Sequence, residues 1–500
     1  MSQIQIQNLT FTYDGSYEPI FQDLSLTLDT DWRLGLIGRN GRGKTTLLRL
    51  LCGELEYRGV IQSSVPCDRF PFPVEDPSQN TRAVLQSIAA QAADWEIECE
   101  CNALFLADDV LDRPFVTLSG GEQTKTLLAG FFLREGHFLL IDEPTNHLDE
   151  TARKQVAQYL RRKQGFLLVS HDRTFLDHSV DHILSINKTG PDLQAGTFSS
   201  WWENKQRQDA FERVQNEKLR SEIGRLDAAA KQAEARSRVI EKAKFGGKKE
   251  NGLRPDRGAI GHKSAKMMKR AKSIEGRKLN AADEKSKLLK NIESVEPLFL
   301  TPLSHHASRL AEATDLSLAY GGKQVCRRLR FELHPGDRVV LRGPNGCGKS
   351  SLIKLLAGEP IDHTGSLKLA TGLKISYVPQ DTSFLSGLPQ AYARACGIDL
   401  SRFLTLLRKF DFPRALFEQD MARYSAGQQK KVLLARSLCE QAHLYLWDEP
   451  LNYIDVFSRM QLEALLAETD ATLLFVEHDR MFADRVATDV ISFDAAGSTL

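Results

Sequence analysis

The chain has 500 residues, of which 42% are hydrophobic and 26% are charged, and its formal net charge is +1. This composition is ordinary for a soluble protein of two to four domains. The sequence holds no run of about 18 apolar residues, which argues against a membrane-spanning helix. The alternating residues 1–6 favour a first strand over a signal peptide. We therefore expect a cytoplasmic protein, and its eight cysteines, without any C-x-x-C pair, are expected to be reduced.

A phosphate-binding loop follows the first buried strand. A strand and hairpin region in residues 4–28 is followed by the apolar run 34–37, which leads into the sequence GRNGRGKT of residues 38–45. The glycines allow backbone N–H groups to turn toward a phosphate, while the following helix and Lys44 supply positive potential. In this pattern Thr45 would hold Mg²⁺.

The same loop occurs a second time. Residues 343–350 read GPNGCGKS after another apolar run, and Lys349 lies 305 positions after Lys44. Three further pairs of motif residues keep this spacing within two positions: Ser119 and Ser425, Glu143 and Glu449, and His171 and His478. We interpret this as the internal duplication of a whole domain.

Each copy continues with a helical stretch, in about residues 81–106 and 389–407, and then a serine-glycine motif. The motif reads LSGGEQ in residues 118–123 and YSAGQQ in residues 424–429. A serine and glycines at the start of a helix form an anion-binding terminus. The motif alone could be a simple helix cap, but its place before the next strand in both copies favours phosphate binding.

An apolar strand in each copy then ends in two adjacent carboxylates. The sequences are FLLIDEP in residues 138–144 and LYLWDEP in residues 444–450. The first carboxylate suits Mg²⁺ and the second suits polarising a water, because alternate residues of a strand point to different sides. A further apolar strand ends at His171, and its counterpart ends at His478, where either imidazole could sense a terminal phosphate.

The middle of the chain, residues 203–293, predicts two long helices joined by a loop. Apolar residues at positions 219, 223, 226, 230 and 233 form a coiled-coil seam over a helix in residues 203–241, and a second helix begins near residue 262. The segment has about 25 Lys and Arg against about 14 Asp and Glu, so its net charge is about +11 and the remainder of the chain sums to about −10. A solvated charged face is one reading, and a phosphate-rich partner is the favoured one.

These motifs, present twice in the same order, resemble the ATP-binding cassette family over about residues 4–187 and from about residue 311 to the C-terminus. Twin cassettes joined by a long charged linker are similar to the ABC-F group, which acts on ribosomes rather than on membranes. The resemblance implies an α/β fold class with two ATP-binding cassette (P-loop NTPase) domains, in residues 1–200 and 299–500, and a long α-helical hairpin linker in residues 201–298.

The resemblance also implies ATP and Mg²⁺ as cofactors and gives each motif residue a role. Tyr13 and Tyr320 would stack on adenine, and the two cassettes would close head to tail, so that each ATP lies between the phosphate loop of one and the signature of the other. Glu143, Glu449, His171 and His478 would be catalytic. The Mg²⁺ ligands would be Thr45, Asp142, Ser350, Gln380 and Asp448. ATP would be held by Gly38, Asn40, Gly41, Gly43, Lys44, Thr45, Thr46, Gly343, Asn345, Gly346, Gly348, Lys349, Ser350, Ser351 and Gln380, and by the signature residues Ser119, Gly120, Gly121, Ser425 and Gly427.

Two departures from the family pattern fall on one of the two sites. The first copy has residues 70–74, FPFPV, where the second copy has Gln380, and the second signature has Ala426 in place of a glycine. Both belong to the site formed by Lys44 and Ser425. We therefore predict unequal sites, with the Lys349/Ser119 site the better formed.

The linker is similar to that of the Lsa-like antibiotic-resistance branch of ABC-F. The resemblance implies a hairpin that reaches past tRNA toward the peptidyl-transferase centre and gives ribosomal protection against lincosamide, pleuromutilin and streptogramin A drugs. The expected partner is the 70S ribosome, with its 23S rRNA and P-site tRNA, and the protein would be a monomer with an intramolecular cassette dimer. We expect the tip at residues 242–252, and RNA contacts from Lys242, Lys244, Phe245, Lys248, Lys249, Arg254, Arg257, Lys263, Lys266, Lys269 and Arg270.

Three rival functions remain open at this stage. A housekeeping translation factor would act on stalled ribosomes without any drug. The ATPase subunit of a drug exporter would need a membrane partner, which the basic linker of about 90 residues does not suggest. A DNA-acting ATPase would bind duplex DNA in preference to ribosomes. The favoured prediction includes neither a membrane nor DNA as a partner.

Overall fold

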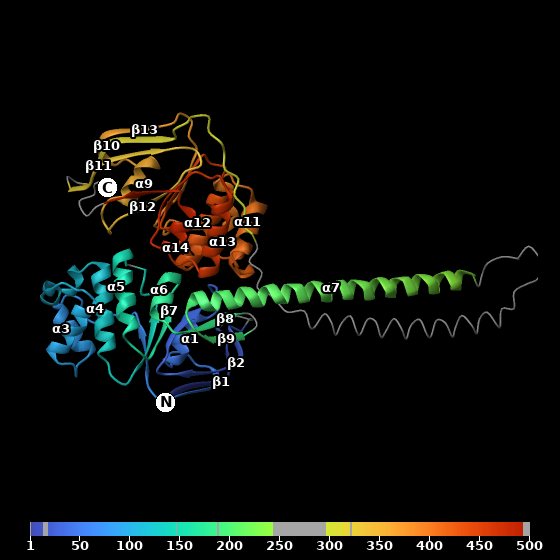
Figure 1. Cartoon of the computed structure of the whole chain (residues 1–500), viewed down its shortest axis with the longest axis horizontal. Helices are drawn as coiled ribbons and strands as arrows, with labels where there is room; N and C mark the ends of the chain where they lie inside the picture. The colour runs from blue at the N-terminus through green and yellow to red at the C-terminus, as the bar shows by residue number, and fades with distance from the viewer. Residues whose placement is uncertain are drawn as a thin grey trace, which may run out of the picture. The chain divides into compact units, whose positions relative to one another are not determined.

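The computed structural model describes residues 2–13, 19–146, 148–187, 190–243, 297–320 and 323–493. It divides into two compact units, one made of Met1–Trp201 and Val295–Leu500 and the other of Trp202–Ser294. The first unit contains both copies of the duplicated motifs, and each copy has its own pair of sheets (Figure 1).

The first copy is built on a six-stranded sheet in the order β5, β6, β7, β3, β8, β9. Its neighbouring strands are parallel, apart from β9, which pairs antiparallel with β8. The carboxyl ends of the parallel strands therefore meet at one edge, where ligands of such sheets bind. The strands are β3 (Arg33–Ile37), β5 (Cys67–Phe70), β6 (Phe138–Asp142), β7 (Phe166–Val169), β8 (His182–Asn187) and β9 (Gly190–Ala195).

An antiparallel sheet and six helices complete the first copy. The sheet has the order β2, β1, β4, formed by β1 (Gln3–Phe11), β2 (Phe21–Asp29) and β4 (Arg58–Ser63). The leucines of α1 share one core with the inward side chains of β1 and β3, which fixes the start of α1 at the phosphate loop. The helices are α1 (Lys44–Leu51), α2 (Thr81–Ile88), α3 (Asp94–Ala103), α4 (Gly120–Phe132), α5 (Glu150–Arg161) and α6 (Arg173–Ser179).

The second copy repeats this arrangement. Its parallel sheet has the order β14, β15, β16, β12, β17, and its antiparallel sheet has the order β11, β10, β13. The strands are β10 (Ala311–Tyr320), β11 (Lys323–Leu333), β12 (Arg338–Arg342), β13 (Asp362–Leu369), β14 (Ile375–Val378), β15 (Leu444–Asp448), β16 (Leu473–Val476) and β17 (Asp489–Ser492). The helices are α9 (Lys349–Leu356), α10 (Pro389–Ala395), α11 (Leu400–Lys409), α12 (Ala426–Cys439), α13 (Val456–Glu468) and α14 (Arg480–Val486).

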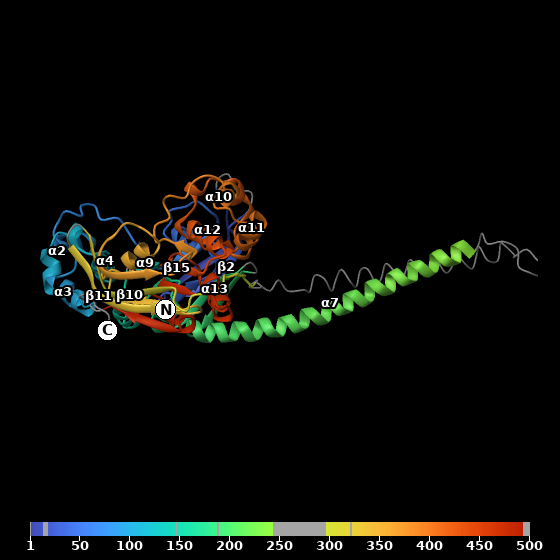
Figure 2. The same ribbon diagram turned by 90° about the horizontal axis from the view of Figure 1, so that it is seen from above.

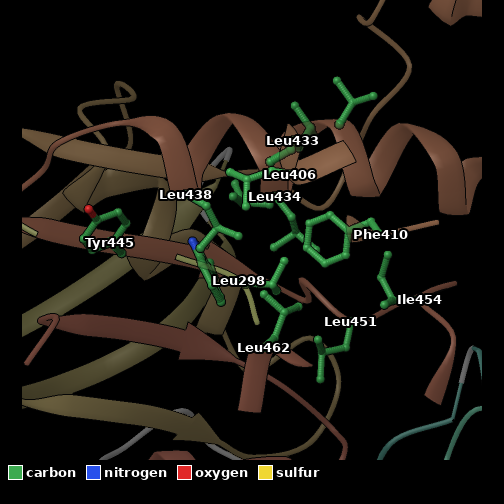
Figure 3. Packing of buried hydrophobic residues seen from close by; sticks show 14 of the residues in the cluster. Leu298, Leu406, Phe410, Leu433, Leu434, Leu438, Tyr445, Leu451, Ile454 and Leu462 are labelled. Carbon is green, nitrogen blue, oxygen red and sulfur yellow. The ribbon is translucent and has the colours of Figure 1, made fainter. Parts of the chain in front are cut away.

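A large apolar core joins the helices of the second copy to its parallel sheet. Figure 3 shows Leu406 and Phe410, at the end of α11, beside Leu433 and Leu434 of α12. Leu298, which precedes the first strand of this copy, is buried in the same core. The core therefore fixes the helices on either side of the second signature relative to β15, which carries its carboxylates.

The helical stretches predicted before each signature are divided in the structure. The first consists of α2 and α3, because the chain turns at Ala89, whose carbonyl accepts the N–H of Ala92 at 3.0 Å. The second consists of α10 and α11. The prediction of helix is confirmed here, and the breaks within it were not predicted.

The long first helix predicted in residues 203–241 is α7 (Phe198–Ala243). Its 46 residues span about 69 Å, and Figure 2 shows a gentle curve along its length. At its start Trp201 is buried, with its ring 5.8 Å from that of Phe198 and 6.5 Å from that of Phe457. The second predicted helix lies outside the described residues. Within the part of the chain that is described, no helix is long and apolar enough to cross a membrane.

Candidate nucleotide sites

Both phosphate loops lead into their helix through a glycine with left-handed backbone, Gly43 at φ 87° and Gly348 at φ 97°. A β-carbon at Gly43 would lie 2.7 Å from the ring of Phe21, so a side chain does not fit there. The ammonium of Lys44 donates to the carbonyl oxygens of Gly38 and Arg39, at 2.8 and 3.2 Å. Lys349 donates to the corresponding carbonyls of its own loop, both at 2.8 Å. Each lysine is thus held against the backbone of its own phosphate loop.

The residue after each lysine contacts the first carboxylate of its own copy. Thr45 Oγ1 donates to Asp142 Oδ2 at 3.0 Å, and Ser350 Oγ donates to Asp448 Oδ1 at 2.9 Å. The other oxygen of Asp448 is buried without a hydrogen-bond partner, and burial raises the pKa of this carboxyl to about 6. A hydroxyl and a carboxylate with an unsatisfied oxygen are donors that fit Mg²⁺, whose charge would compensate the buried group.

The second carboxylate of each pair stands just after the strand rather than within it. Glu143 has φ 51° and Glu449 has φ 47°, a left-handed conformation that is uncommon outside glycine. This backbone turn, and not the alternation of a strand, separates each glutamate from the preceding aspartate. Nε2 of His171 lies 3.3 Å from Glu143 Oε1, and Nε2 of His478 lies 3.6 Å from Glu449 Oε1. The structure therefore brings together the two predicted catalytic groups in each copy.

Gln380 makes the surroundings of the two glutamates unequal. Its amide donates to Glu449 Oε2 at 2.7 Å, and the amide of Asn452 donates to the same oxygen at 2.6 Å. At the corresponding position of the first copy, Phe72 packs against an aromatic side chain of α4, with its ring 5.7 Å from that of Phe131. Glu143 Oε1 is buried, and the His171 imidazole 3.3 Å away does not meet the geometry of a hydrogen bond.

The pKa values of the two glutamates shift in opposite directions. Burial, together with the neighbouring Asp142, raises the pKa of Glu143 to about 8. Burial also disfavours the charged form of Glu449, but the nearby His478, the charge of Lys430 and the hydrogen bond from Gln380 outweigh this effect and lower the pKa of Glu449. The surroundings therefore favour the ionised form of Glu449, as a group that polarises water requires, and disfavour the ionised form of Glu143.

The predicted head-to-tail partners Lys349 and Ser119 line one cavity of about 940 Å³. Ser119 caps α4, because its Oγ accepts the N–H of Glu122 at 3.3 Å, and it presents the glycine-rich start of that helix to the cavity. The cavity has the size of a nucleotide site. Other predicted residues in its lining are Gly120, Gly121, Asn345, Gly346, Gly348, Ser350, Ser351, Gln380, Glu449 and His478.

The opposite pair of motifs is held together by direct contacts between the two copies. The amide of Asn40 donates to the backbone carbonyl of Tyr453 at 2.8 Å. A β-carbon on Gly427 would lie 2.5 Å from that carbonyl and 3.1 Å from Asn40 Nδ2, so only glycine fits at this approach. Arg42 of the phosphate loop also forms a salt bridge of 2.9 Å with Asp411. The second signature therefore meets the first phosphate loop, as the head-to-tail arrangement requires.

Several predicted residues do not enter this geometry. The hydroxyl of Tyr13 lies 3.0 Å from Thr46 Oγ1, beside the first loop. Tyr320 ends β10, and its side chain lies outside the described part of the chain. Lys242 lies in the last turn of α7, and the other predicted RNA contacts, in residues 244–270, lie outside the described residues, as does most of the predicted tip.

Two buried lysines of α12, which the sequence analysis did not single out, support the segments around the two sites. Lys430 donates to the backbone carbonyls of Pro379 and Asp448 at 2.8 and 3.2 Å, and burial lowers its pKa to about 8. Lys431 lies 2.7 Å from Asp455 Oδ2, and Asp455 in turn caps α13. Both lysines follow the signature directly, and nothing in the local sequence marks them as buried.

Comparisons with known proteins identify the family of the chain. A family model described as "ABC transporter" matches residues 21–146 and 326–452. The ATP-binding protein Uup of Caulobacter vibrioides is 30% identical to this chain, over 97% of the chain and 76% of its own length. The ribosome protection protein VmlR of Bacillus subtilis is 25% identical, with coverages of 95% and 84%. The energy-dependent translational throttle protein EttA of Escherichia coli is 24% identical, with coverages of 96% and 90%.

Solved structures agree on the fold. The archaeal ribosome recycling factor aABCE1, solved with the ribosomal stalk protein aP1, aligns with a TM-score of 0.64 and 21% identity over 99% of this chain and 89% of its own. A structure of RNase-L Inhibitor aligns with a TM-score of 0.62 and 20% identity over 99% and 90%. The duplicated motifs, the paired sheets and the sequence relatives all lead to the same conclusion. The chain belongs to the ABC-F family of ATPases, which have two ATP-binding cassettes on one polypeptide.

Proposed function

We propose that this ATPase acts on the ribosome in the cytoplasm. The observation that carries the proposal is that the same chain has two ATP-binding cassettes and a strongly basic segment with a net charge of about +11. No helix among the described residues is long and apolar enough to cross a membrane. Relatives named as a ribosome protection protein and as a translational throttle, which this chain covers over more than four fifths of their length, support a ribosomal partner.

The geometry of the cassettes suggests how ATP would be used. ATP at the Lys349/Ser119 site would be held between the two cassettes, so its binding favours their closed arrangement. Mg²⁺, held by Ser350 and Asp448, would neutralise charge on the phosphates. The ionised Glu449, fixed by Gln380 and Asn452, would then orient and polarise the attacking water. Hydrolysis removes the link between the cassettes and allows them to open.

The finer proposal is ribosomal protection. The basic residues of the linker, from Lys242 to Arg270, would contact 23S rRNA and P-site tRNA as the hairpin extends toward the peptidyl-transferase centre. This would promote release of lincosamide, pleuromutilin and streptogramin A antibiotics. The relationship to VmlR supports this role.

A housekeeping role in translation is the second candidate, and the relationship to EttA supports it to a similar degree. The protection role and the housekeeping role differ in one observable property. A protection protein raises the drug concentration that inhibits growth of a host expressing it, whereas a housekeeping factor leaves it unchanged. An exporter subunit would instead sediment with membranes, and a DNA-acting ATPase would bind duplex DNA more tightly than ribosomes.

The test is co-sedimentation of the double variant Glu143→Gln/Glu449→Gln with 70S ribosomes in the presence of ATP and Mg²⁺. The variant should bind ATP and hydrolyse it slowly, so the closed form should remain on the ribosome. The matched control is the same variant without nucleotide, which should stay in the supernatant. A variant that is loaded with ATP and still does not sediment with ribosomes would overturn the proposed partner.

A further inference from the structure

The helices α3 and α11, which occupy the same place in the two cassettes, end in the same unusual way. In each, the N–H groups of two successive residues bond back to carbonyls three and five positions earlier, at 2.8–3.1 Å. This pattern ends a helix through one left-handed residue, which is normally glycine. Here the left-handed residues are Phe105, at φ 56°, and Asp411, at φ 57°. A residue with a side chain is strained in this conformation, so we expect a contact that compensates the strain.

Asp411 has such a contact. Its carboxylate forms the 2.9 Å salt bridge with Arg42, in the phosphate loop of the other cassette. The left-handed turn therefore directs this side chain across the boundary between the cassettes, toward the Lys44/Ser425 site.

Phe105 cannot make the same contact. The residue in the second phosphate loop that corresponds to Arg42 is Cys347, which is buried and lies against its own Lys349, with its Sγ 3.9 Å from the ammonium. Phe105 remains 59% exposed. Exposure of a single aromatic ring is common, but this ring also lines the 940 Å³ cavity together with Ser119 and Lys349.

We propose that Phe105 is a contact for the adenine base of ATP at the Lys349/Ser119 site, supplied by the opposite cassette. The phosphates occupy the part of the cavity formed by Lys349 and the signature. Apolar side chains in the lining, Phe105, Leu106 and Val325, then offer the surface for the base. An aromatic ring stacks on a purine face and excludes water from it. This inference rests on the proposed roles of Lys349 and Ser119 as phosphate contacts.

The test measures ligand binding by isothermal titration in the Glu143→Gln/Glu449→Gln background, with ATP and with inorganic tripolyphosphate, which lacks the base. Phe105→Ala should lower the ATP affinity of one of the two sites about tenfold and leave the tripolyphosphate affinity unchanged. Phe105→Tyr should retain the ATP affinity. Phe105→Gly should show the same loss as alanine with an equal or higher melting temperature, because glycine suits the left-handed backbone.

A matched control is Val116→Ala, since Val116 is 61% exposed on the same cassette and outside the cavity lining. It should change neither affinity. Unchanged ATP binding by Phe105→Ala, or an equal loss of tripolyphosphate binding, would overturn the base contact. If the parent variant binds no ATP at all, the proposed roles of Lys349 and Ser119 fail, and this inference fails with them.

Discussion

The carboxylate of Glu477 accepts the backbone N–H of Leu451 at 3.2 Å, inside the second cassette. The other oxygen of Glu477 accepts the N–H groups of His478 and Asp479, at 2.7 and 3.1 Å. The first cassette has Ser170 and Thr145 at the two corresponding positions, with their hydroxyl oxygens 3.5 Å apart. The two cassettes therefore use different chemistry to join the strand that leads to His171 or His478 to the segment after the paired carboxylates.

We predict that the variant Glu477→Ser weakens the connection between these two segments in the second cassette. The shortened side chain leaves the buried N–H of Leu451 unsatisfied, which destabilises this segment by about 1–3 kcal/mol. Hydrogen exchange measured by mass spectrometry should then show faster exchange of the Leu451 amide. The double variant Leu451→Thr/Glu477→Ser, which copies the first cassette, should recover part of the protection. Glu468→Ser, at an exposed glutamate of α13, is the control. Identical exchange in the wild type and in Glu477→Ser would contradict the prediction.

Glu143 and Glu449, the two glutamates proposed as catalytic, should contribute unequally to ATP turnover. Only Glu449 has Gln380 and an ionised carboxylate, so Glu449→Gln should remove most of the steady-state ATPase rate. Glu143→Gln should leave the larger residual rate, because the first copy has Phe72, packed on Phe131, at the position where Gln380 contacts Glu449. Both rates are measured with saturating ATP and Mg²⁺, with the double variant as the baseline. Equal residual rates for the single variants would count against unequal sites.

A buried ion pair between the cassettes should be important for stability. Arg173 Nη2 lies 2.5 Å from Glu463 Oε2, and both side chains are almost fully buried. Glu463→Ala leaves the guanidinium buried without its partner, which costs about 3–5 kcal/mol and should lower the melting temperature in a thermal scan. Arg173→Leu/Glu463→Leu removes both charges and should cost less than the single change. A single variant as stable as the wild type would show that the pair contributes nothing.

Neighbouring cysteines should differ sharply in reactivity. Burial, with the nearby Glu100, raises the pKa of Cys101 to about 12, whereas Cys99 is exposed. Alkylation requires the thiolate, which a raised pKa makes scarce at every pH below that value. Iodoacetamide at pH 8 should therefore label Cys99 well before Cys101, as read by peptide mass spectrometry. In denaturant the two rates should converge, and equal labelling of the native protein would contradict the buried position of Cys101.

The sequence predicted the parts of the sites that depend on local pattern. The loops around Lys44 and Lys349 follow from glycine spacing, and the duplication predicted that each copy repeats the other. Contacts between distant segments were not visible in this way. The salt bridge of Arg42 with Asp411 joins residues 369 positions apart, and nothing in either local pattern marks them as partners.

Phe72 and Phe105 show a second limit of sequence reasoning. The absence of a glutamine near Phe72 was visible, but its packing on Phe131 depends on where α4 lies. Phe105 reads as one more apolar residue at the end of a helix, because its left-handed backbone is decided by the helix-ending hydrogen bonds. Comparison of the two copies at the spacing of Ser119 and Ser425 would have paired it with Asp411 and marked the position.

The left-handed backbone at Glu143 and Glu449 implies a trade of stability for activity. Glycine relieves the strain of this conformation, so Glu449→Gly should fold more stably than Glu449→Ala, while neither retains the carboxylate. The residue with the least backbone strain at this position is therefore glycine, which has no carboxylate to polarise a water. The chain carries this strain twice, once in each cassette. A screen for thermal stability alone would therefore select against the two glutamates that we propose as catalytic.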